Sequence, residues 1–293
     1  MKPSTLANKA NEHLIKKWKE NPNHPAVLYL KNRGLDISDV RKFKLGWMEN
    51  SSILKDLKKC IIIPIIDEEN RVISFIGRKI SDDEQPKYKL SSAFPFNKSA
   101  TLFNINNAIE SRRHSVYVVE GPFDAIMLDK KGYPAVALLG ALFSKQMYEK
   151  LYSYFPTIVI ALDNDIAGYK SMLNIYKRWG DTLKFALPKD DDKKDYGENT
   201  TPRWTTIEEI ALRYYRYIRK KTLIRSNITD EWVNFVLFGE GKAIYKVKDV
   251  RDIINFNIIE EKIDEEQKIE GIIELEIRHY KKHILSSLGV RGT

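Results

Sequence analysis

Two short apolar runs constrain the fold of this chain more than any other feature of its sequence. Residues 116–119 read Val-Tyr-Val-Val, and residues 157–162 read Thr-Ile-Val-Ile-Ala-Leu. Both runs are rich in β-branched residues and do not alternate with polar ones, which is typical of strands buried on both faces of a parallel sheet. The sequence therefore predicts an α/β fold with a central, mostly parallel sheet.

Acidic residues follow both runs. Glu120 opens the segment Glu-Gly-Pro-Phe-Asp, and the second run is followed by Asp163 and Asp165. Ligands of open α/β sheets bind beyond the carboxyl ends of the strands, so we expect these three side chains to gather there. Crowded carboxylates raise one another's pKa, and a divalent cation relieves that conflict. We expect a Mg²⁺ (or Mn²⁺) site; the alternative is that the acids are solvated turn residues.

The order of these motifs resembles the toprim domain, whose signature is a Glu-Gly-x-x-Asp turn followed by Asp-x-Asp after a later strand. Further segments extend the resemblance to the catalytic core of DnaG-type primases of bacteria and phages. These segments are residues 29–35, 63–65, 76–78, 86–88, 96–98, 102–103, 139–142, 187–188 and 194–195. The resemblance covers about residues 25–200. It implies a DNA-dependent RNA primase that makes short primers on single-stranded DNA by metal-assisted nucleotidyl transfer.

The resemblance also implies roles for the acids. The catalytic residues would be Glu120, Asp163 and Asp165, and Asp124 and Asp195 would join them as metal ligands. Glu120 is the candidate for helping to deprotonate the attacking ribose hydroxyl, although a purely ligating role stays open. The third acidic motif lies in a run with four aspartates, of which Asp195 matches best by its preceding lysine and Asp192 is the alternative. The other two are Asp190 and Asp191.

Basic residues of the family's N-terminal subdomain hold single-stranded nucleic acid. The matching positions here are Arg33, Arg78, Lys87 and Lys98. The chain has 49 basic and 40 acidic residues, and its net charge of +9 suits a polyanionic partner. For each of the four, the alternative is a solvated surface charge. Tyr88 and Trp47 either stack on bases or pack in the core.

We expect three domains, with an α+β basic subdomain over residues 1–108. The toprim domain would cover 109–200, and a helical subdomain 201–293. In the basic subdomain, apolar residues at helical spacing over residues 5–20 and 24–33 precede two predicted antiparallel strands at 61–66 and 72–76. Pro64 indicates that the first of these strands has an edge or a bulge.

Partners follow partly from the cysteine content. The single cysteine, Cys60, excludes an internal disulfide and a zinc module built from several cysteines. Full-length primases of this family carry an N-terminal zinc module, so the resemblance implies that a separate zinc-bearing factor or a replicative helicase assists, or that template selection is relaxed. The other partners that the resemblance implies are the single-stranded DNA template and ribonucleoside triphosphates. No apolar run reaches the length of a membrane span, so we expect a cytoplasmic protein (the host's cytoplasm if a phage encodes it) and no membrane partner.

Two rival functions stay open on the sequence alone. A toprim nuclease would use the same acids to hydrolyse a phosphodiester, and a non-catalytic module would keep the fold for nucleic-acid binding. The pieces Gly77-Arg78 and Pro86-Lys87-Tyr88 favour a primase over a nuclease.

Overall fold

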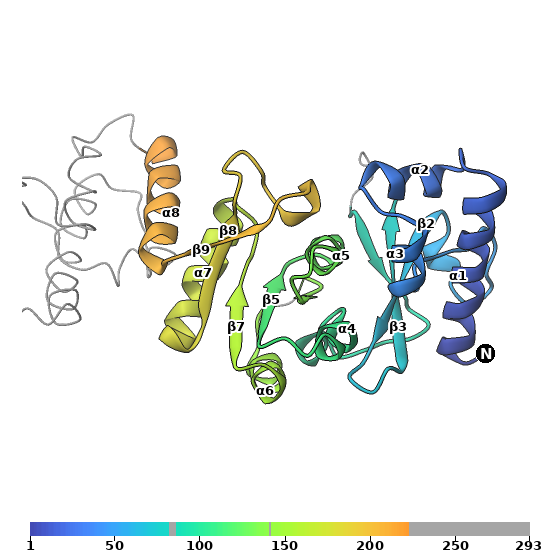
Figure 1. The fold of residues 1–293 in the computed structure, drawn as a ribbon, viewed down its shortest axis with the longest axis horizontal. Helices are drawn as coiled ribbons and strands as arrows, with labels where there is room; N and C mark the ends of the chain where they lie inside the picture. The colour runs from blue at the N-terminus through green and yellow to red at the C-terminus, as the bar shows by residue number, and fades with distance from the viewer. Residues whose placement is uncertain (82–85, 141, 223–293) are drawn as a thin grey trace, which may run out of the picture. The chain divides into compact units, whose positions relative to one another are not determined.

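The computed structural model describes residues 1–81, 86–140 and 142–222 (Figure 1). Its contacts divide the chain into two units. The first consists of Met1–Asn164 and Thr182–Trp204. The second begins with Asp165–Asp181 and continues from Thr205, and its described part ends at residue 222. Each unit is described separately below.

Three helices open the first unit: α1 (Pro3–Glu20), α2 (Pro25–Asn32) and α3 (Ile37–Lys42). Proline at the first turn suits the starts of α1 and α2, because a proline there loses no helical hydrogen bond. Gly34 follows α2 with a φ of +76°, a backbone conformation that glycine adopts without strain. Asp36 caps α3 by accepting hydrogen bonds from the backbone N–H groups of Ser38 and Asp39.

An antiparallel sheet follows these helices. Its strands lie in the order β1 (Gly46–Trp47), β2 (Cys60–Ile66), β3 (Val72–Lys79) and β4 (Tyr88–Leu90). The short β1 pairs only with Ile61 and Ile62, so β2 is an edge strand where Pro64 lies. The register between β2 and β3 also shifts between Ile65 and Ile66. The expectation that this strand has an edge or a bulge is confirmed, although Pro64 itself pairs regularly with Phe75 and the irregularity lies after Ile65.

The second sheet has five strands in the order β6-β5-β7-β8-β9. Their bounds are β5 (Ser115–Val119), β6 (Ala135–Ala137), β7 (Thr157–Ile160), β8 (Lys184–Pro188) and β9 (Pro202–Thr205). β5 pairs in parallel with β6 and β7, and β7 pairs in parallel with β8. The predicted α/β class with a mostly parallel sheet is therefore confirmed, and residues 116–119 are all buried as expected.

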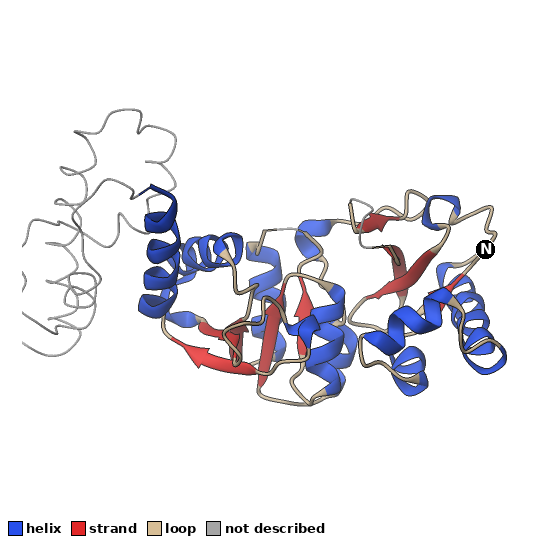
Figure 2. Ribbon diagram, turned by 90° about the horizontal axis from the view of Figure 1, so that it is seen from above, coloured by secondary structure: helices blue, strands red, loops and turns tan. Residues whose placement is uncertain are grey.

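Helices α4 (Ile105–Glu110), α5 (Pro122–Lys130) and α6 (Lys145–Tyr154) accompany the second sheet. Figures 1 and 2 show α4 and α5 between the two sheets. Short 3-10 helices complete the chain path. They are η1 (Lys55–Leu57), η2 (Lys98–Ala100), η3 (Gly180–Thr182) and η4 (Tyr196–Glu198).

One continuous apolar core joins the two sheets of the first unit. It includes Leu30 of α2, Ile63 of β2, Phe123 of α5 and Val119 of β5. Since each of these side chains is no more than 3% exposed, the antiparallel layer and the parallel layer bury their apolar surface against each other. The position of the N-terminal helices over α5 is therefore fixed by packing.

Ion pairs reinforce the contact between α3 and α5. Lys130 of α5 donates hydrogen bonds to Asp36 and Asp39, and Lys42 of α3 pairs with Asp129. The Asp39 side chain is only 8% exposed, so its negative charge depends on Lys130 for compensation.

The described part of the second unit contains α7 (Ile166–Trp179) and α8 (Ile207–Thr222), which pack against each other. α8 confirms the expected helix after residue 201. The rest of the expected helical subdomain, residues 223–293, lies outside the described residues. In the part of the chain that the structure describes, no helix combines the length and apolarity needed to cross a membrane.

The ion pair at α5 leads to a stability prediction. Lys130→Met should lower the free energy of unfolding by about 1–3 kcal/mol, because it leaves the buried Asp39 carboxylate without its counter-ion. Lys145→Met is the matched control, since its pair with Glu149 on α6 is exposed, and it should change stability by less than about 0.5 kcal/mol. Urea unfolding measures both, and equal effects of the two variants would contradict the prediction.

Candidate active site

Three loops that follow parallel strands carry the acidic side chains of the candidate site. Glu120 follows β5, Asp163 follows β7, and Asp195 follows β8. Because parallel strands end at the same edge of a sheet, this connectivity brings the loops together. The side chain of Glu120 accepts a hydrogen bond from the backbone N–H of Asp163, with 3.4 Å between Oε1 and N. The expected proximity of these two motifs is therefore present in the fold.

Asp124, in the first turn of α5, connects two of these loops. Its Oδ2 accepts a hydrogen bond from Gly121 N at 3.1 Å, and its Oδ1 accepts one from Gly197 N at 2.9 Å. The second bond ties α5 to η4, directly beside Asp195. A Cβ atom at Gly197 would lie only 3.0 Å from Asp195 Oδ1 and 3.1 Å from Asp124 Oδ1. Glycine at 197 therefore leaves room for two carboxylates next to each other.

The electrostatics show how closely the acids interact. Burial, together with the charges of Glu120, Asp124 and Asp195, raises the pKa of Asp163 to about 8, while Lys194 opposes this rise. Burial likewise raises the pKa of Asp124, with a contribution from Asp195, against the two backbone N–H groups that favour its charged form. We call Glu120, Asp124, Asp163 and Asp195 the acid cluster.

Lys194 supplies one positive charge at the acid cluster. Its Nζ lies 3.8 Å from Asp163 Oδ2, and the Lys194 side chain is 55% exposed whereas that of Asp163 is 18% exposed. Such an exposed ammonium compensates only part of the negative charge, because solvent screens it.

The chemistry of the acid cluster fits a hard divalent cation. Among the residues that the structure describes, no three His, Cys, Asp or Glu side chains are placed to hold a metal ion by themselves. Mg²⁺ does not require such a cage, since it usually takes one or two carboxylates and completes its octahedron with water and substrate phosphates. Burial and three neighbouring carboxylates raise the pKa of Asp163, and a bound cation would instead favour its charged form.

The other acidic residues that the sequence singled out lie differently. Asp165 belongs to the second unit, where its Oδ1 accepts a hydrogen bond from Gly168 N at 2.9 Å and caps α7. Asp190, Asp191 and Asp192 are exposed. Within the run of four aspartates, the structure therefore places Asp195 in the acid cluster and the other three at the surface.

An aromatic and basic layer from the N-terminal sheet and helices borders the acid cluster. Arg78 is 4% exposed, its Nε donates to the Tyr29 hydroxyl at 2.7 Å, and its guanidinium lies 5.0 Å from the centre of the Tyr88 ring. The Arg33 guanidinium lies 4.8 Å from the Tyr29 ring centre and 5.0 Å from that of Phe123. Arginine stacked in this way keeps its planar group in a fixed orientation.

Two glycines mark where this layer meets the acids. A Cβ atom at Gly121 would lie 3.7 Å from the Tyr88 hydroxyl, and one at Gly197 would lie 3.7 Å from Arg33 Nη1. Arg33 and Tyr88 are thus neighbours of the loops that carry Glu120 and Asp195. The two other basic positions, Lys87 and Lys98, are exposed. Trp47 is 4% exposed and packs edge-on against His24, so its packing role in the core is confirmed.

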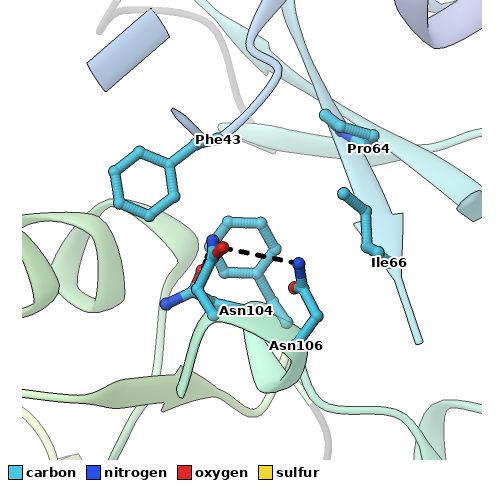
Figure 3. Close-up of a pocket in the computed structure, with 7 residues that line it drawn as sticks. Phe43, Pro64, Ile66, Asn104 and Asn106 are labelled. Carbon is cyan, nitrogen blue, oxygen red and sulfur yellow. Dashed lines mark hydrogen bonds between the residues drawn. The ribbon is translucent and has the colours of Figure 1, made fainter. Parts of the chain in front are cut away.

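An open groove lies beside Arg33. Its volume is about 390 Å³, and its lining consists of Pro25, Leu28, Tyr29, Asn32, Arg33 and Ile80. A second hollow, between β2 and α4, is shown in Figure 3, where Pro64 and Ile66 face Asn104 and Asn106. Its volume of about 10 Å³ has room for roughly one water molecule, so it is not a substrate site.

Sequence reasoning missed several residues of the site. Tyr29 orients both arginines, Gly197 anchors Asp124, and Lys194 faces Asp163. Tyr29 and Lys194 stand within segments that carry the resemblance, but no spacing or composition indicates their partners. Gly197 gives no signal, because its role depends on a contact with a residue 73 positions away.

Two family models match adjacent parts of the chain. Residues 48–109 match the N-terminal domain of the DNA primase catalytic core, and residues 114–186 match the toprim domain. The DNA primase of Thermotoga maritima is 31% identical over 178 residues, covering 50% of this chain and 31% of that protein. The chain spans about a third of the length of the curated relatives it matches.

Solved structures share the fold. The DnaG primase catalytic domain bound to single-stranded DNA has a TM-score of 0.56 at 19% identity, over 76% of this chain and 83% of that one. The RNA polymerase domain of Mycobacterium tuberculosis primase DnaG, in complex with a double-stranded DNA oligomer with a 6-nucleotide overhang, has a TM-score of 0.60 at 17% identity. That match covers 98% of this chain and 96% of the other.

The pKa of Asp163 predicts how stability depends on pH without divalent cations. A carboxyl with a pKa of 3.8 when unfolded and about 8 when folded binds its proton more tightly in the folded state. The melting temperature in EDTA should therefore fall as the pH rises from about 4 to about 8. Asp163→Asn should flatten this slope and be the more stable protein at pH 8.

Asp192→Asn is the control for this measurement, because that carboxylate is 79% exposed and should leave the slope as in the unmodified chain. Thermal unfolding at constant ionic strength measures all three proteins. If Asp163→Asn keeps the full slope, the carboxyl of Asp163 is not the group that titrates.

Proposed function

We propose, from the premise that this chain carries a DnaG-type primase catalytic core with its toprim domain, that it synthesises short RNA primers on single-stranded DNA. The reaction would be DNA-dependent nucleotidyl transfer from ribonucleoside triphosphates. The observation that carries the proposal is the acid cluster at the carboxyl ends of β5, β7 and β8, bordered by Arg33 and Tyr88. Negative metal-binding groups next to phosphate-binding groups are what phosphoryl chemistry on a polyanion requires.

We assign different roles to the acids according to their hydrogen bonds. Asp163 and Asp195, with Glu120, are our candidates for holding the cation, and a ligand role for Asp165 stays a prediction of the sequence. Both oxygens of Asp124 already accept backbone N–H bonds, so we assign Asp124 to the edge of this set, where it fixes the loop that carries Asp195. A bound magnesium ion would neutralise the triphosphate and the charge that develops during in-line attack on the α-phosphorus.

Glu120 is our candidate for the general base. Its carboxylate is oriented by the Asp163 N–H, and it would accept the proton of the attacking ribose 3′-hydroxyl. Arg33, with a guanidinium held over two aromatic rings, is our candidate for contacting phosphates. Arg78 is buried and bonded to Tyr29, so we assign it to orienting Tyr29 and Tyr88. The exposed Lys87 and Lys98 would bind the nucleic-acid backbone at longer range.

Partners and organisation are proposed on the same premise. The template would be single-stranded DNA, and a helicase or a separate zinc-bearing factor would direct the protein to its start sites. The division into subdomains at 1–108, 109–200 and 201–293 stays a prediction. A cytoplasmic location is proposed with the replication function.

Removing Asp163 tests the proposal directly. Asp163→Ala should abolish dinucleotide and primer synthesis while single-stranded DNA binding stays largely intact, because the acid serves the cation and not the template. Asp192→Ala, which removes an exposed aspartate of the neighbouring loop, should keep activity. The assay combines single-stranded DNA, labelled ribonucleotides and magnesium or manganese.

The products of that assay separate the rival functions. RNA of a few nucleotides supports a primase, and shortened DNA would show a toprim nuclease. Neither product, together with tight DNA binding, would show a non-catalytic module. Loss of synthesis and DNA binding together in a folded Asp163→Ala protein would contradict the assigned role.

Arg33 provides a second test. Arg33→Ala should weaken single-stranded DNA binding and reduce the slope of log K against log salt by about 0.7, the value for one lost phosphate contact. Lys16→Ala is the control, since Lys16 is an exposed lysine paired with Glu20 on α1. Fluorescence anisotropy over a salt series measures both, and an unchanged slope in Arg33→Ala would remove this residue from the interface.

A further inference from the structure

The loop that carries Asp195 consists entirely of charged residues. Between the end of β8 and the start of η4, residues 189–195 read Lys-Asp-Asp-Asp-Lys-Lys-Asp. Such a loop has no apolar side chain to bury, so the hydrophobic effect contributes little to fixing its position next to the acid cluster. The ion pairs of Lys193 with Asp192 and Glu198 are exposed, at 3.6 Å and 3.9 Å, and are therefore weak anchors.

Hydrogen bonds hold the base of this loop where it leaves β8. Lys189 N donates to the carbonyl oxygen of Thr201 at 2.8 Å, and Thr200 Oγ1 donates to Asp190 Oδ2 at 2.6 Å. These bonds fix the first two residues of the loop. The position of residues 191–194 depends on a different contact.

Asn164 anchors residues 191–194 to the loop that follows β7. Its side-chain Nδ2 donates hydrogen bonds to the carbonyl oxygens of Asp191, at 3.2 Å, and Lys193, at 3.1 Å. Its backbone N–H donates to the carbonyl oxygen of Lys194 at 2.6 Å. Three carbonyl groups of the charged loop therefore converge on one residue, which belongs to the same unit as the loop.

The order of the strands explains why the loop after β7 contacts the loops on both sides of it. β7 lies between β5 and β8. The backbone N–H of Asp163 donates to Glu120 in the loop after β5, and the next N–H, that of Asn164, donates to the loop after β8. Two successive backbone groups thus connect the three strand ends that carry Glu120, Asp163 and Asp195.

The chemistry of these bonds calls for an amide at position 164. Both partners of Nδ2 are carbonyl oxygens, which only accept hydrogen bonds, and one NH₂ group supplies the two donors that they need. Aspartate has the same shape as asparagine but offers no donor when ionised, so it would place a negative charge against two carbonyl oxygens. Alanine would leave both carbonyl groups without this donor.

The anchored loop brings charged groups to the acid cluster. Lys194, whose carbonyl oxygen accepts from Asn164 N, places its Nζ 3.8 Å from Asp163 Oδ2. Asp195 follows directly and completes the acid cluster. A loop held by three hydrogen bonds keeps these groups at constant positions, which a metal site requires of the groups around it.

We propose that Asn164 is a positioning residue of the acid cluster. Its amide holds residues 191–194 in place, so that Lys194 stays beside Asp163 and Asp195 stays in the acid cluster, ready for a divalent cation. In this role the side chain contacts neither substrate nor cation and acts through the loop. This inference rests on the proposed function, since it concerns the metal site of the same reaction.

Binding of Mn²⁺ to the whole chain, without nucleic acid or nucleotides, tests this inference. Asn164→Asp keeps the shape of the side chain but removes its donors, and it should weaken Mn²⁺ binding about tenfold, a usual effect of losing a group that orients metal ligands. Added negative charge alone would act in the opposite direction, because it attracts the cation. Asn164→Ala, which removes the amide without adding charge, should weaken binding to a similar extent.

Asn199→Asp is the matched control. It makes the same chemical change just after η4, at an exposed residue whose φ of +67° aspartate also tolerates. This variant should bind Mn²⁺ at least as tightly as the unmodified chain. Electron paramagnetic resonance of free Mn²⁺ gives the affinities, and melting temperatures in EDTA show whether each variant is folded.

Hydrogen exchange detects a loosened loop independently of the metal. In EDTA, the backbone N–H groups of residues 189–195 should exchange several times faster in both Asn164 variants than in the unmodified chain. They include the N–H of Lys193, which donates to the carbonyl oxygen of Asp190 at 3.0 Å. Primer synthesis by the variants should recover at saturating Mn²⁺, because they lose metal affinity and no reacting group.

Three results would overturn the inference and leave the proposed function intact. They are unchanged or tighter Mn²⁺ binding in the Asn164 variants, weaker binding with unchanged exchange of the loop, and equal weakening by Asn199→Asp. If the unmodified chain binds no Mn²⁺, the proposed metal site fails first and this inference fails with it.

Discussion

The repulsion among four carboxylates at one end of a parallel sheet is the constraint on which the rest of this structure depends. Glu120, Asp163 and Asp195 come from loops that the sheet topology brings together, and Asp124 comes from the first turn of α5. Backbone N–H groups of Gly121 and Gly197 stabilise Asp124, and Lys194 offsets part of the charge on Asp163. The remaining negative potential is what makes the site suited to a cation and, through it, to phosphates.

Holding such a cluster requires a rigid surrounding, and the first unit provides it. The antiparallel layer and the parallel layer share one apolar core, and Lys130 joins α5 to the capped start of α3. Arg33 lies at the end of α2, so the same packing that fixes α2 over Phe123 also fixes this guanidinium near the acids. Stability and site geometry thus depend on the same interface.

The sequence predicted those features that depend on local patterns. Unbroken β-branched runs gave the buried parallel strands, and strand-end acids gave Glu120 and Asp163 as neighbours, because parallel connectivity determines where strand ends lie. The sequence could not decide between Asp192 and Asp195, because the conformation of the loop determines which aspartate is exposed. Nor could it find Gly197, whose importance comes from a contact with Asp124 that is made only in the folded chain.

The central claim is that the acid cluster binds one divalent cation at the carboxyl edge of the parallel sheet. A crystal structure of the chain soaked in Mn²⁺, with anomalous diffraction data collected near the manganese edge, tests this claim most directly. The account predicts an anomalous peak in contact with a carboxylate oxygen of Asp163 and with an oxygen of Glu120 or Asp195. A peak only at a distant surface site, or none at a Mn²⁺ concentration that supports synthesis, would contradict it.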